Sequence, residues 1–188
     1  MFDFIKAAYP YNTNIPIQSK SGDISDINVS KNLILSKPDI IFHLAAIVSG
    51  QAEQEFDLGW DINAKGSWGL FEAIRQQGDN YCPRLVFTSS IAVFGAPFPD
   101  KIPDDFFTTP LTSYGAQKAI SELLLADYSR KKMIDGVSIR LPTICVRPGK
   151  PNLAASGFFS GIIREPLNGQ EAIPVSYTHL RAHETNSH

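Results

Sequence analysis

The sequence has few cysteines and no long apolar run. Its two cysteines, Cys82 and Cys145, are far apart and lie in apolar surroundings, which is typical of reduced core thiols; a disulfide or redox pair is the alternative. The longest apolar stretches, such as residues 39–48, are too short to span a bilayer. The first residues also lack the charged and apolar regions of a secretory signal. We therefore expect a cytoplasmic protein with no membrane partner.

An excess of positive charge is also absent. The 17 Lys and Arg residues are dispersed among 19 Asp and Glu residues, and the net charge is −2. Without a basic patch, the sequence gives no indication of a nucleic-acid partner. With 188 residues, of which 43% are hydrophobic and 19% charged, the chain suits one soluble globular domain.

Histidine is scarce outside the last segment, since residues 175–188 hold three of the four histidines. His179 and His183 are four residues apart, a spacing that suits a metal on one helix face. The segment has no apolar periodicity, however, and we interpret it as a non-native or disordered tail. We assign no metal, and we expect residues 1–174 to form a partial dinucleotide-binding domain.

Compact apolar runs alternate with helix-like segments. The runs are rich in Val, Ile, Leu and Phe without clean alternation, which predicts strands buried on both faces; they cover residues 38–46, 83–90 and 136–146. Helical patterns cover residues 26–37, 61–80 and 113–133. Strand–helix alternation predicts right-handed crossovers and an α/β fold, a Rossmann-like doubly wound parallel sheet.

Polar residues follow the predicted strands, at the edge where ligands collect in such sheets. One strand ends in Thr88, Ser89 and Ser90, another ends near His43, and a third ends in Pro142 and Thr143. The sequence "SYGAQK" places Tyr114 one helical turn before Lys118. This spacing alone is weak evidence, so the prediction depends on these groups meeting at one edge.

If they meet, an alcohol oxidation follows from their chemistry. The ammonium of Lys118 would favour the phenolate and lower the pKa of Tyr114 from about 10. Such a phenol can accept a proton from a substrate alcohol while a hydride leaves for a nicotinamide. Ser90 would hydrogen-bond the same oxygen, with Thr88 and Ser89 as alternatives one register step away. Alternatively, the tyrosine and lysine are ordinary solvated helix residues.

Four ordered blocks, "HLAA", "FTSSIAVFG", "SYGAQK" and "RLPTICVRPG", resemble the extended short-chain dehydrogenase/reductase family, which includes nucleotide-sugar epimerases and dehydratases. The resemblance covers roughly residues 15–174. Residues 43–75 and 140–175 resemble D-erythronate dehydrogenases within that family. This implies NAD as cofactor and a sugar acid such as D-erythronate as substrate, oxidised at the C2 hydroxyl to the 2-oxo acid. A nucleotide-sugar epimerase or dehydratase, or a non-catalytic dinucleotide-binding remnant, are the alternatives.

The resemblance also assigns roles to individual residues. It implies catalysis by Ser90, Tyr114 and Lys118, and substrate contact by Ser90, Tyr114 and Arg147. It implies cofactor contact by Asp23, Ile24, Leu44, Ala45, Ala46, Asn63, Tyr114, Lys118, Pro142 and Thr143. Ser49 and Gly50 are further candidates for substrate contact.

Several of these residues have structural alternatives. Asp23 suits a turn or a helix N-terminus, and Asn63 suits a side-chain bond that ties down a loop. His43 is interpreted as a packed residue at a strand end, and Arg147 as either a carboxylate-binding or a surface residue. The family also implies a possible homodimer through helices 61–77 and 113–131. The apolar side chains there fit either this contact or packing onto the sheet; they are Trp68, Phe71, Leu124 and Tyr128.

Two features that the family uses to hold the cofactor are missing from these residues. The glycine-rich turn for the pyrophosphate is absent, and so is the acidic residue at the end of the second strand that selects NAD over NADP. Most of the C-terminal substrate portion is also missing, so we expect an internal piece of a larger protein.

The missing turn leads to a first prediction, that the 188-residue chain alone binds NAD weakly or not at all. Each lost hydrogen bond to a charged phosphate removes about 1.5–3 kcal/mol, so several together lower the affinity by orders of magnitude. Isothermal titration calorimetry measures this directly. Micromolar affinity would contradict the prediction.

Overall fold

The structure is a computed structural model that describes residues 1–4, 16–143, 146, 154 and 157–172. Two short parallel strands, β1 (Phe2–Asp3) and β2 (Lys20–Ser21), form one sheet. A second parallel sheet has the order β3–β4–β5 and comprises β3 (Ile40–His43), β4 (Arg84–Ser90) and β5 (Asp135–Leu141). The predicted α/β fold with a parallel sheet is confirmed, although each strand is shorter than its apolar run.

The helices connect these strands as the crossover rule requires. In chain order they are α1 (Ile27–Ile34), α2 (Ser49–Gln54), α3 (Phe56–Gly59), the π-helix η1 (Trp60–Lys65), α4 (Gly66–Arg75), the 3₁₀ turn η2 (Ile91–Val93), α5 (Ser113–Arg130) and α6 (Gly157–Leu167). Within the described part of the chain, none of these is both long and apolar enough to cross a bilayer.

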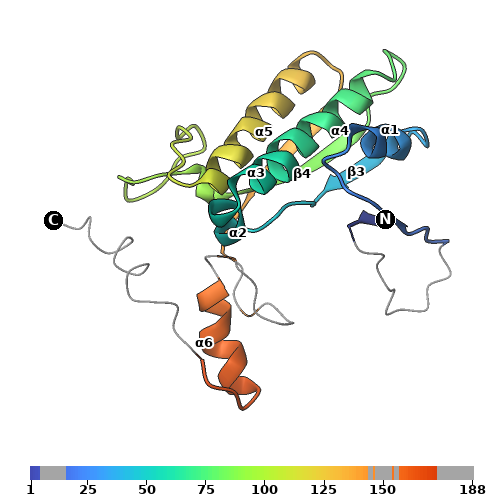
Figure 1. The fold of residues 1–188 in the computed structure, drawn as a ribbon. Coiled ribbons are helices and arrows are strands. Elements are labelled where there is room, and N and C mark those ends of the chain that lie inside the picture. The colour runs from blue at the N-terminus through green and yellow to red at the C-terminus, as the bar shows by residue number, and fades with distance from the viewer. Residues whose placement is uncertain (5–15, 144–145, 147–153, 155–156, 173–188) are drawn as a thin grey trace.

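One face of the β3–β4–β5 sheet carries the hydrophobic core. Helices α1, α4 and α5 lie side by side over this face (Figure 1). From β4, Leu85 and Phe87 point into the helical layer, where Phe71 of α4 and Leu125 of α5 meet them. All four side chains are at most 1% exposed. This packing fixes α5, and therefore Tyr114 and Lys118, against the end of β4.

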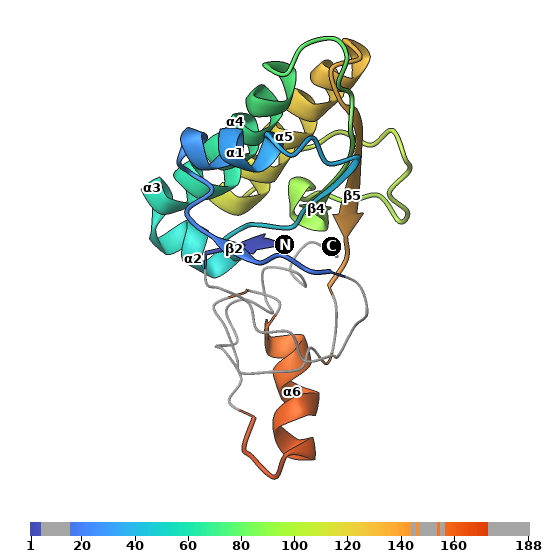
Figure 2. The same ribbon diagram turned by 90° about the vertical axis from the view of Figure 1, so that its right-hand side faces the viewer.

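The opposite face of the sheet is open, which corrects the expectation that these strands are buried on both faces. Every second residue of β5 is exposed, and Val137 and Ile139 are 46% and 44% exposed. On β3, Ile40 and Phe42 point the same way and are 57% and 66% exposed. Apolar composition predicted the strands correctly but not their burial, because helices among the described residues cover one side only (Figure 2).

The predicted helix 61–80 is part of a longer helical segment that runs from Phe56 to Arg75 and ends before Gly78. Its π-helical turn, residues 60–65, holds one more residue per turn than an α-helix, a feature often found at functional sites. Gly78 has a φ of +85°, a left-handed conformation that suits glycine after a helix. The π-turn positions Asn63, which is fully buried.

Candidate functional site

The N-terminus of α5 lies directly against the end of β4. Thr112 caps the helix by accepting a hydrogen bond from the Gly115 amide at 3.1 Å. Ser90 ends β4 and accepts a hydrogen bond from the Ala92 amide, also at 3.1 Å. A side chain at position 115 would overlap the Ala92 carbonyl oxygen, so glycine is what allows the helix to approach. As a result, the Tyr114 phenol lies beside Ser90, whose side chain acts to lower the pKa of the phenol.

Strand register separates Ser90 from its two neighbours. Ser89 faces the helices and is 3% exposed. Thr88 donates its hydroxyl to the His43 carbonyl on β3 at 3.1 Å. Of these three hydroxyls, the one beside Tyr114 is therefore that of Ser90; its catalytic role stays a prediction.

Lys118 is held beneath the tyrosine. Its Nζ donates to the Thr88 carbonyl at 2.8 Å and lies 5.6 Å from the centroid of the Tyr114 ring and 4.7 Å from that of Phe87. The lysine is only 2% exposed, and this burial lowers its pKa to about 8. The ammonium is thus close to the phenol, as the spacing predicted.

The pKa of Tyr114 differs from the sequence prediction. Burial raises it, and the hydrogen bond with Ser90 opposes this without reversing it. The predicted lowering by Lys118 is therefore wrong for the protein without ligands. The physical reason is that both groups are removed from water, so each is driven toward its neutral form.

His43 is a packed residue rather than a catalyst. It is 4% exposed, its Nε2 lies 2.9 Å from the Ser67 hydroxyl, and its ring contacts Phe87 at a centroid distance of 5.5 Å. Burial, with a smaller effect of the Lys118 charge, lowers its pKa to about 3. It is therefore neutral throughout the physiological range, as expected of a packed strand-end residue.

The second prediction concerns acid stability. Because the pKa of His43 falls from 6.5 to about 3 on folding, only the unfolded chain binds this proton between those values. The free energy of unfolding should decrease as the pH falls through this window, by up to about 1.4 kcal/mol per pH unit from this group. His43→Leu should flatten this slope, and Ser67 would keep the Asn63 carbonyl as its acceptor, at 2.6 Å. Urea unfolding at a series of pH values tests this; equal slopes between pH 6.5 and 5 in both proteins would contradict it.

Asn63 ties the loop after β3 to the rest of the fold. Its side-chain oxygen accepts from the Ile47 amide at 2.9 Å, and its amide donates to the Ile47 carbonyl at 3.3 Å and to Gln117 Oε1 at 2.8 Å. Asn63 is fully buried and uses both ends of its amide, so it has the loop-tying role that was its alternative; its contact with a cofactor stays a prediction.

Gln117 was not identified from the sequence. It is 1% exposed and joins α5 to Asn63, so it links the helix of Tyr114 and Lys118 to the loop of residues 44–47. Its Nε2 is buried and has no hydrogen-bond partner among the described residues. The sequence places Gln117 directly before Lys118, which could have drawn attention to it. Its partner Asn63 is 54 residues away in the chain, however, so no local pattern indicates the bond.

The third prediction tests this link. Gln117→Leu leaves the Asn63 amide with only the longer bond to Ile47, and we expect a loss of about 1–3 kcal/mol in the free energy of unfolding. Gln76→Leu is the control, because Gln76 makes an exposed bond to Glu72, and its replacement should change stability by less than about 0.5 kcal/mol. Urea denaturation of both variants measures the difference; equal effects would contradict the role of Gln117.

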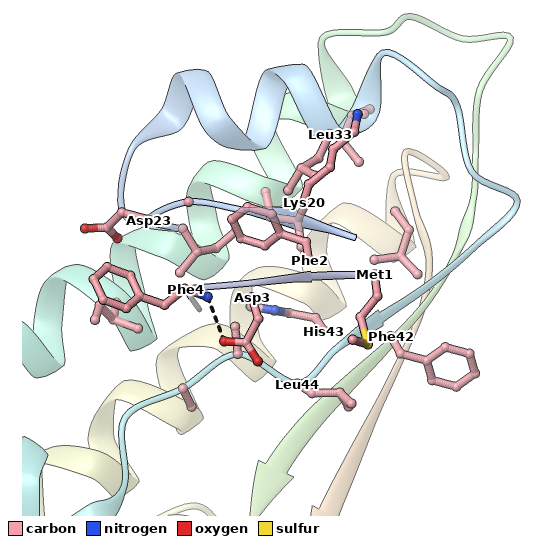
Figure 3. A pocket seen from close by; sticks show the side chains of 18 of the residues that line it. Met1, Phe2, Asp3, Phe4, Lys20, Asp23, Leu33, Phe42, His43 and Leu44 are labelled. Carbon is pink, nitrogen blue, oxygen red and sulfur yellow. Dashed lines mark hydrogen bonds between the residues drawn. The ribbon is translucent and has the colours of Figure 1, made fainter. Parts of the chain in front are cut away.

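Five of the predicted cofactor residues line one cavity of about 1090 Å³, which lies between β1 and β3 (Figure 3). They are Asp23, Ile24, Leu44, Ala45 and Ala46. The alanines leave the backbone after β3 open to a flat ligand, and Leu44 is 63% exposed. The structure thus brings together residues that are about 20 positions apart in the sequence.

Two carboxylates lie at one end of this cavity. Asp23 accepts hydrogen bonds from the Ser25 amide at 2.9 Å and from its hydroxyl at 2.7 Å, so it has the turn role that was its alternative. Asp3 ends β1, lines the same cavity, and accepts from the Phe4 amide at 2.6 Å. Asp3 is thus an acidic residue at the end of a strand, which the sequence patterns did not single out. A two-residue strand has no periodicity by which the sequence could reveal it.

The remaining assignments are less constrained. Pro142 and Thr143 follow the end of β5, and Ser49 and Gly50 begin α2. Arg147, Cys145, His179, His183 and the tail lie outside the described residues.

Cys82 is exposed, which corrects its expected place in the core. Phe71 is fully buried in the core, so of its two alternatives it packs onto the sheet.

Comparison with known sequences adds to this geometry. The profile of the NAD dependent epimerase/dehydratase family matches residues 6–182. A D-erythronate dehydrogenase of Cupriavidus necator is 55% identical over 152 residues, which are 81% of this chain and 46% of the relative. A D-erythronate dehydrogenase of Haemophilus influenzae is 52% identical over 77% of this chain and 45% of the relative. The chain spans about half the length of these curated relatives.

Solved structures agree with the fold. A nucleoside-diphosphate-sugar epimerase from Agrobacterium tumefaciens superposes with a TM-score of 0.84 at 58% identity, over 93% of this chain and 52% of that chain. UDP-glucose 4-epimerase of Thermus thermophilus, solved with NAD, has a TM-score of 0.71 over 84% of this chain and 51% of that chain. Its identity of 23% supports the fold alone.

Proposed function

Because the chain belongs to the NAD-dependent epimerase/dehydratase family, we propose that it forms part of an NAD-dependent dehydrogenase that oxidises the C2 hydroxyl of a sugar acid such as D-erythronate. The observation that carries the proposal is the convergence of three groups: Tyr114 lies beside Ser90, and the buried Lys118 has its Nζ 5.6 Å from the centroid of the tyrosine ring. The two curated relatives, both more than 50% identical, are D-erythronate dehydrogenases.

Each member of the cluster has a distinct role in this proposal. Tyr114 receives the hydroxyl proton of the substrate, and Ser90 hydrogen-bonds the same oxygen while it becomes a carbonyl. Lys118 lies on the other side of the tyrosine and stabilises the phenolate that forms. Because the pKa of Tyr114 is raised in the free protein, the oxidation rate should increase with pH.

The cavity between β1 and β3 fits the adenosine side of NAD. Small side chains after β3 leave room for a flat ring, and the two carboxylates at its end are suitable acceptors for ribose hydroxyls. We propose that Asp3 receives these hydroxyls and disfavours the extra phosphate of NADP by charge repulsion. When bound, NAD supplies the acceptor for the hydride. Pro142 and Thr143 are proposed to cover the nicotinamide, and Arg147 to bind the substrate carboxylate.

The second candidate is a nucleotide-sugar epimerase or dehydratase. The Agrobacterium tumefaciens structure, 58% identical, supports it by its description as a nucleoside-diphosphate-sugar epimerase. The same Ser–Tyr–Lys cluster would serve either reaction, since both begin with oxidation of an alcohol. The substrate group, carboxylate or nucleotide, therefore distinguishes the two.

The experiment uses the product of the complete gene. Formation of NADH with D-erythronate supports the dehydrogenase, and conversion of a UDP- or GDP-sugar without net NADH supports the epimerase. NADP in place of NAD tests the role of Asp3, with Asp3→Asn as the variant. Turnover of neither substrate class would reject both candidates.

We also propose that the complete protein dimerises through α4 and α5. Trp68 and Leu123 lie on these helices and are 44% and 68% exposed, so two copies could bury them in a four-helix contact. Sedimentation velocity of the protein and of Leu123→Ser would test this. A monomer in both cases would reject the dimer.

A further inference from the structure

One arginine near the end of β5 lies beside the segments that carry Ser90 and Tyr114. Arg140 directly precedes Leu141, which pairs with Ser90 in the register of β4 and β5. Because side chains of a strand alternate, Leu141 is exposed while Arg140 lies on the helical side of the sheet. The guanidinium is therefore at the level of the strand ends where the candidate site lies.

The first contact of Arg140 is an ion pair with α5. Its Nε donates to Glu122 Oε1 at 3.1 Å and its Nη2 donates to Oε2 at 2.8 Å, so two parallel hydrogen bonds join the guanidinium to the carboxylate. The side chain of Glu122 is 10% exposed and that of Arg140 is 31% exposed. Glu122 is one helical turn after Lys118, as Lys118 is one turn after Tyr114. The ion pair therefore fixes the side of α5 that carries both site residues.

The second contact joins Arg140 to the turn after Ser90. Its Cζ lies 4.8 Å from the centroid of the Phe94 ring, which is a cation–π contact. Phe94 donates its amide to the Ile91 carbonyl at 3.0 Å, so it belongs to the turn η2 that Ser90 caps. The same ring packs against Phe106, at a centroid distance of 5.7 Å, in the segment that leads to α5. One guanidinium thus holds this turn as well as the helix.

Strand β5 supplies the third connection. Pro142 and Thr143, which are proposed to cover the nicotinamide, follow Arg140 by two and three residues. Three elements of the proposed site therefore meet at one side chain. They are the turn after β4, helix α5 and the end of β5.

We propose that Arg140 is a positioning residue, which sets the placement of Ser90 relative to Tyr114 by holding Glu122 and Phe94 at the same time. The proposal rests on the proposed function, because it concerns the geometry of that reaction. Arg140 acts through these two neighbours and has no direct contact with the substrate in this scheme.

The two contacts require an arginine. A planar guanidinium pairs with a carboxylate along its edge and with an aromatic ring across its face, whereas an ammonium is a compact point charge. Arg140→Lys therefore keeps the positive charge and loses the two-point bond to Glu122 together with the flat contact to Phe94. This makes lysine the informative replacement.

The effect should fall on turnover more than on stability. Partly exposed ion pairs contribute little to the free energy of unfolding, because solvent screens them. A displacement of a reacting group by about 1 Å, in contrast, lowers turnover by roughly 100-fold. A residue that fixes three segments of a site is therefore expected to change kcat strongly and folding weakly.

The test compares Arg140→Lys with Arg84→Lys in the complete gene product. Arg84 and Asp135 also form an ion pair between β4 and β5, but at the opposite end of the strands, with side chains 60% and 53% exposed. In Arg140→Lys, kcat should fall by roughly 10- to 100-fold, while KM for NAD stays close to that of the parent. Arg84→Lys should change neither constant. Equal kcat values in the two variants would overturn the proposal.

Double-mutant cycles identify the route. Phe94→Leu removes the ring and keeps the ion pair, whereas Glu122→Gln removes the charge and keeps the ring. Each change should lower kcat, and each should have a smaller effect in the Arg140→Lys background, because both contacts pass through the same side chain. Full additivity would show that these residues act independently of Arg140, which would also overturn the proposal.

Hydrogen exchange separates this proposal from the proposed reaction. The amides of Ala92 and Gly115 make hydrogen bonds of 3.1 Å at the starts of η2 and α5. Both should exchange several-fold faster in Arg140→Lys than in the parent or in Arg84→Lys. If neither substrate class is turned over, the proposed function fails, and this comparison still decides the role of Arg140. Unchanged exchange, or faster exchange that is matched by an equal loss of global stability in urea, would overturn it.

Discussion

Replacing Tyr114 with phenylalanine is expected to lower kcat for the sugar-acid oxidation by roughly 100- to 10,000-fold, the range that a general base contributes. In the proposed reaction the phenol accepts the substrate proton, and the hydroxyl of Ser90 is too weak a base to replace it. The ring of phenylalanine would keep the contact with Lys118, whose Nζ lies 5.6 Å from the ring centroid, so the fold should be unchanged.

The measurement is NADH formation by the complete gene product, with circular dichroism to confirm folding. Tyr128→Phe on the same helix is the matched control, since it removes a hydroxyl that donates to Glu72 of α4 at 2.9 Å rather than one beside Ser90. Comparable turnover in the Tyr114→Phe and parent proteins would eliminate the proposed proton acceptor. A large loss in the Tyr128 control would show that the effect is structural.

Replacing Gly115 with alanine should have the second largest effect. The added methyl group would overlap the Ala92 carbonyl oxygen and approach Ala92 C and Pro110 Cβ to 3.0 Å, both rigid backbone or ring positions. We expect a loss of about 1–3 kcal/mol in the free energy of unfolding, as for overpacked sites. Because α5 must shift away from Ser90, turnover should also fall, by more than stability alone explains.

Gly69→Ala is the control for helix propensity. Gly69 lies in α4, and a methyl group there would meet only Ile27 Cγ1, at the ordinary distance of 3.9 Å. That variant should be stabilised by about 0.5–1 kcal/mol, because alanine favours helix more than glycine does. Thermal unfolding and turnover of both variants give the comparison. A Gly115→Ala protein as stable and active as the Gly69→Ala protein would show that α5 does not need this close approach.

Local sequence patterns predicted those parts of the fold and site that depend on neighbouring residues. The apolar runs located all three strands of the larger sheet, and the four-residue spacing placed Tyr114 and Lys118 on one side of α5. Ser90 was the preferred serine, and only the pairing of β4 with its neighbours could separate it from Thr88 and Ser89.

Long-range effects could not be predicted from the sequence in the same way. The link between Gln117 and Asn63 joins residues 54 positions apart, and no local pattern marks it. The pKa of Tyr114 was predicted in the wrong direction because spacing shows the neighbouring charge but not the burial that outweighs it. Likewise, composition identifies an apolar strand but does not show whether anything covers both of its faces.

The π-turn at residues 60–65 constrains the length of the segment that contains it. A π-turn is an α-helix with one residue inserted, so removing one residue there would restore a regular helix. Because the wider turn absorbs the extra residue, the helix beyond it would keep its buried face, including Phe71. The deletion would instead change the local geometry that places the Asn63 side chain against Ile47. A single deletion at the π-turn should therefore disturb the Asn63 link while leaving the core packing of α4 in place.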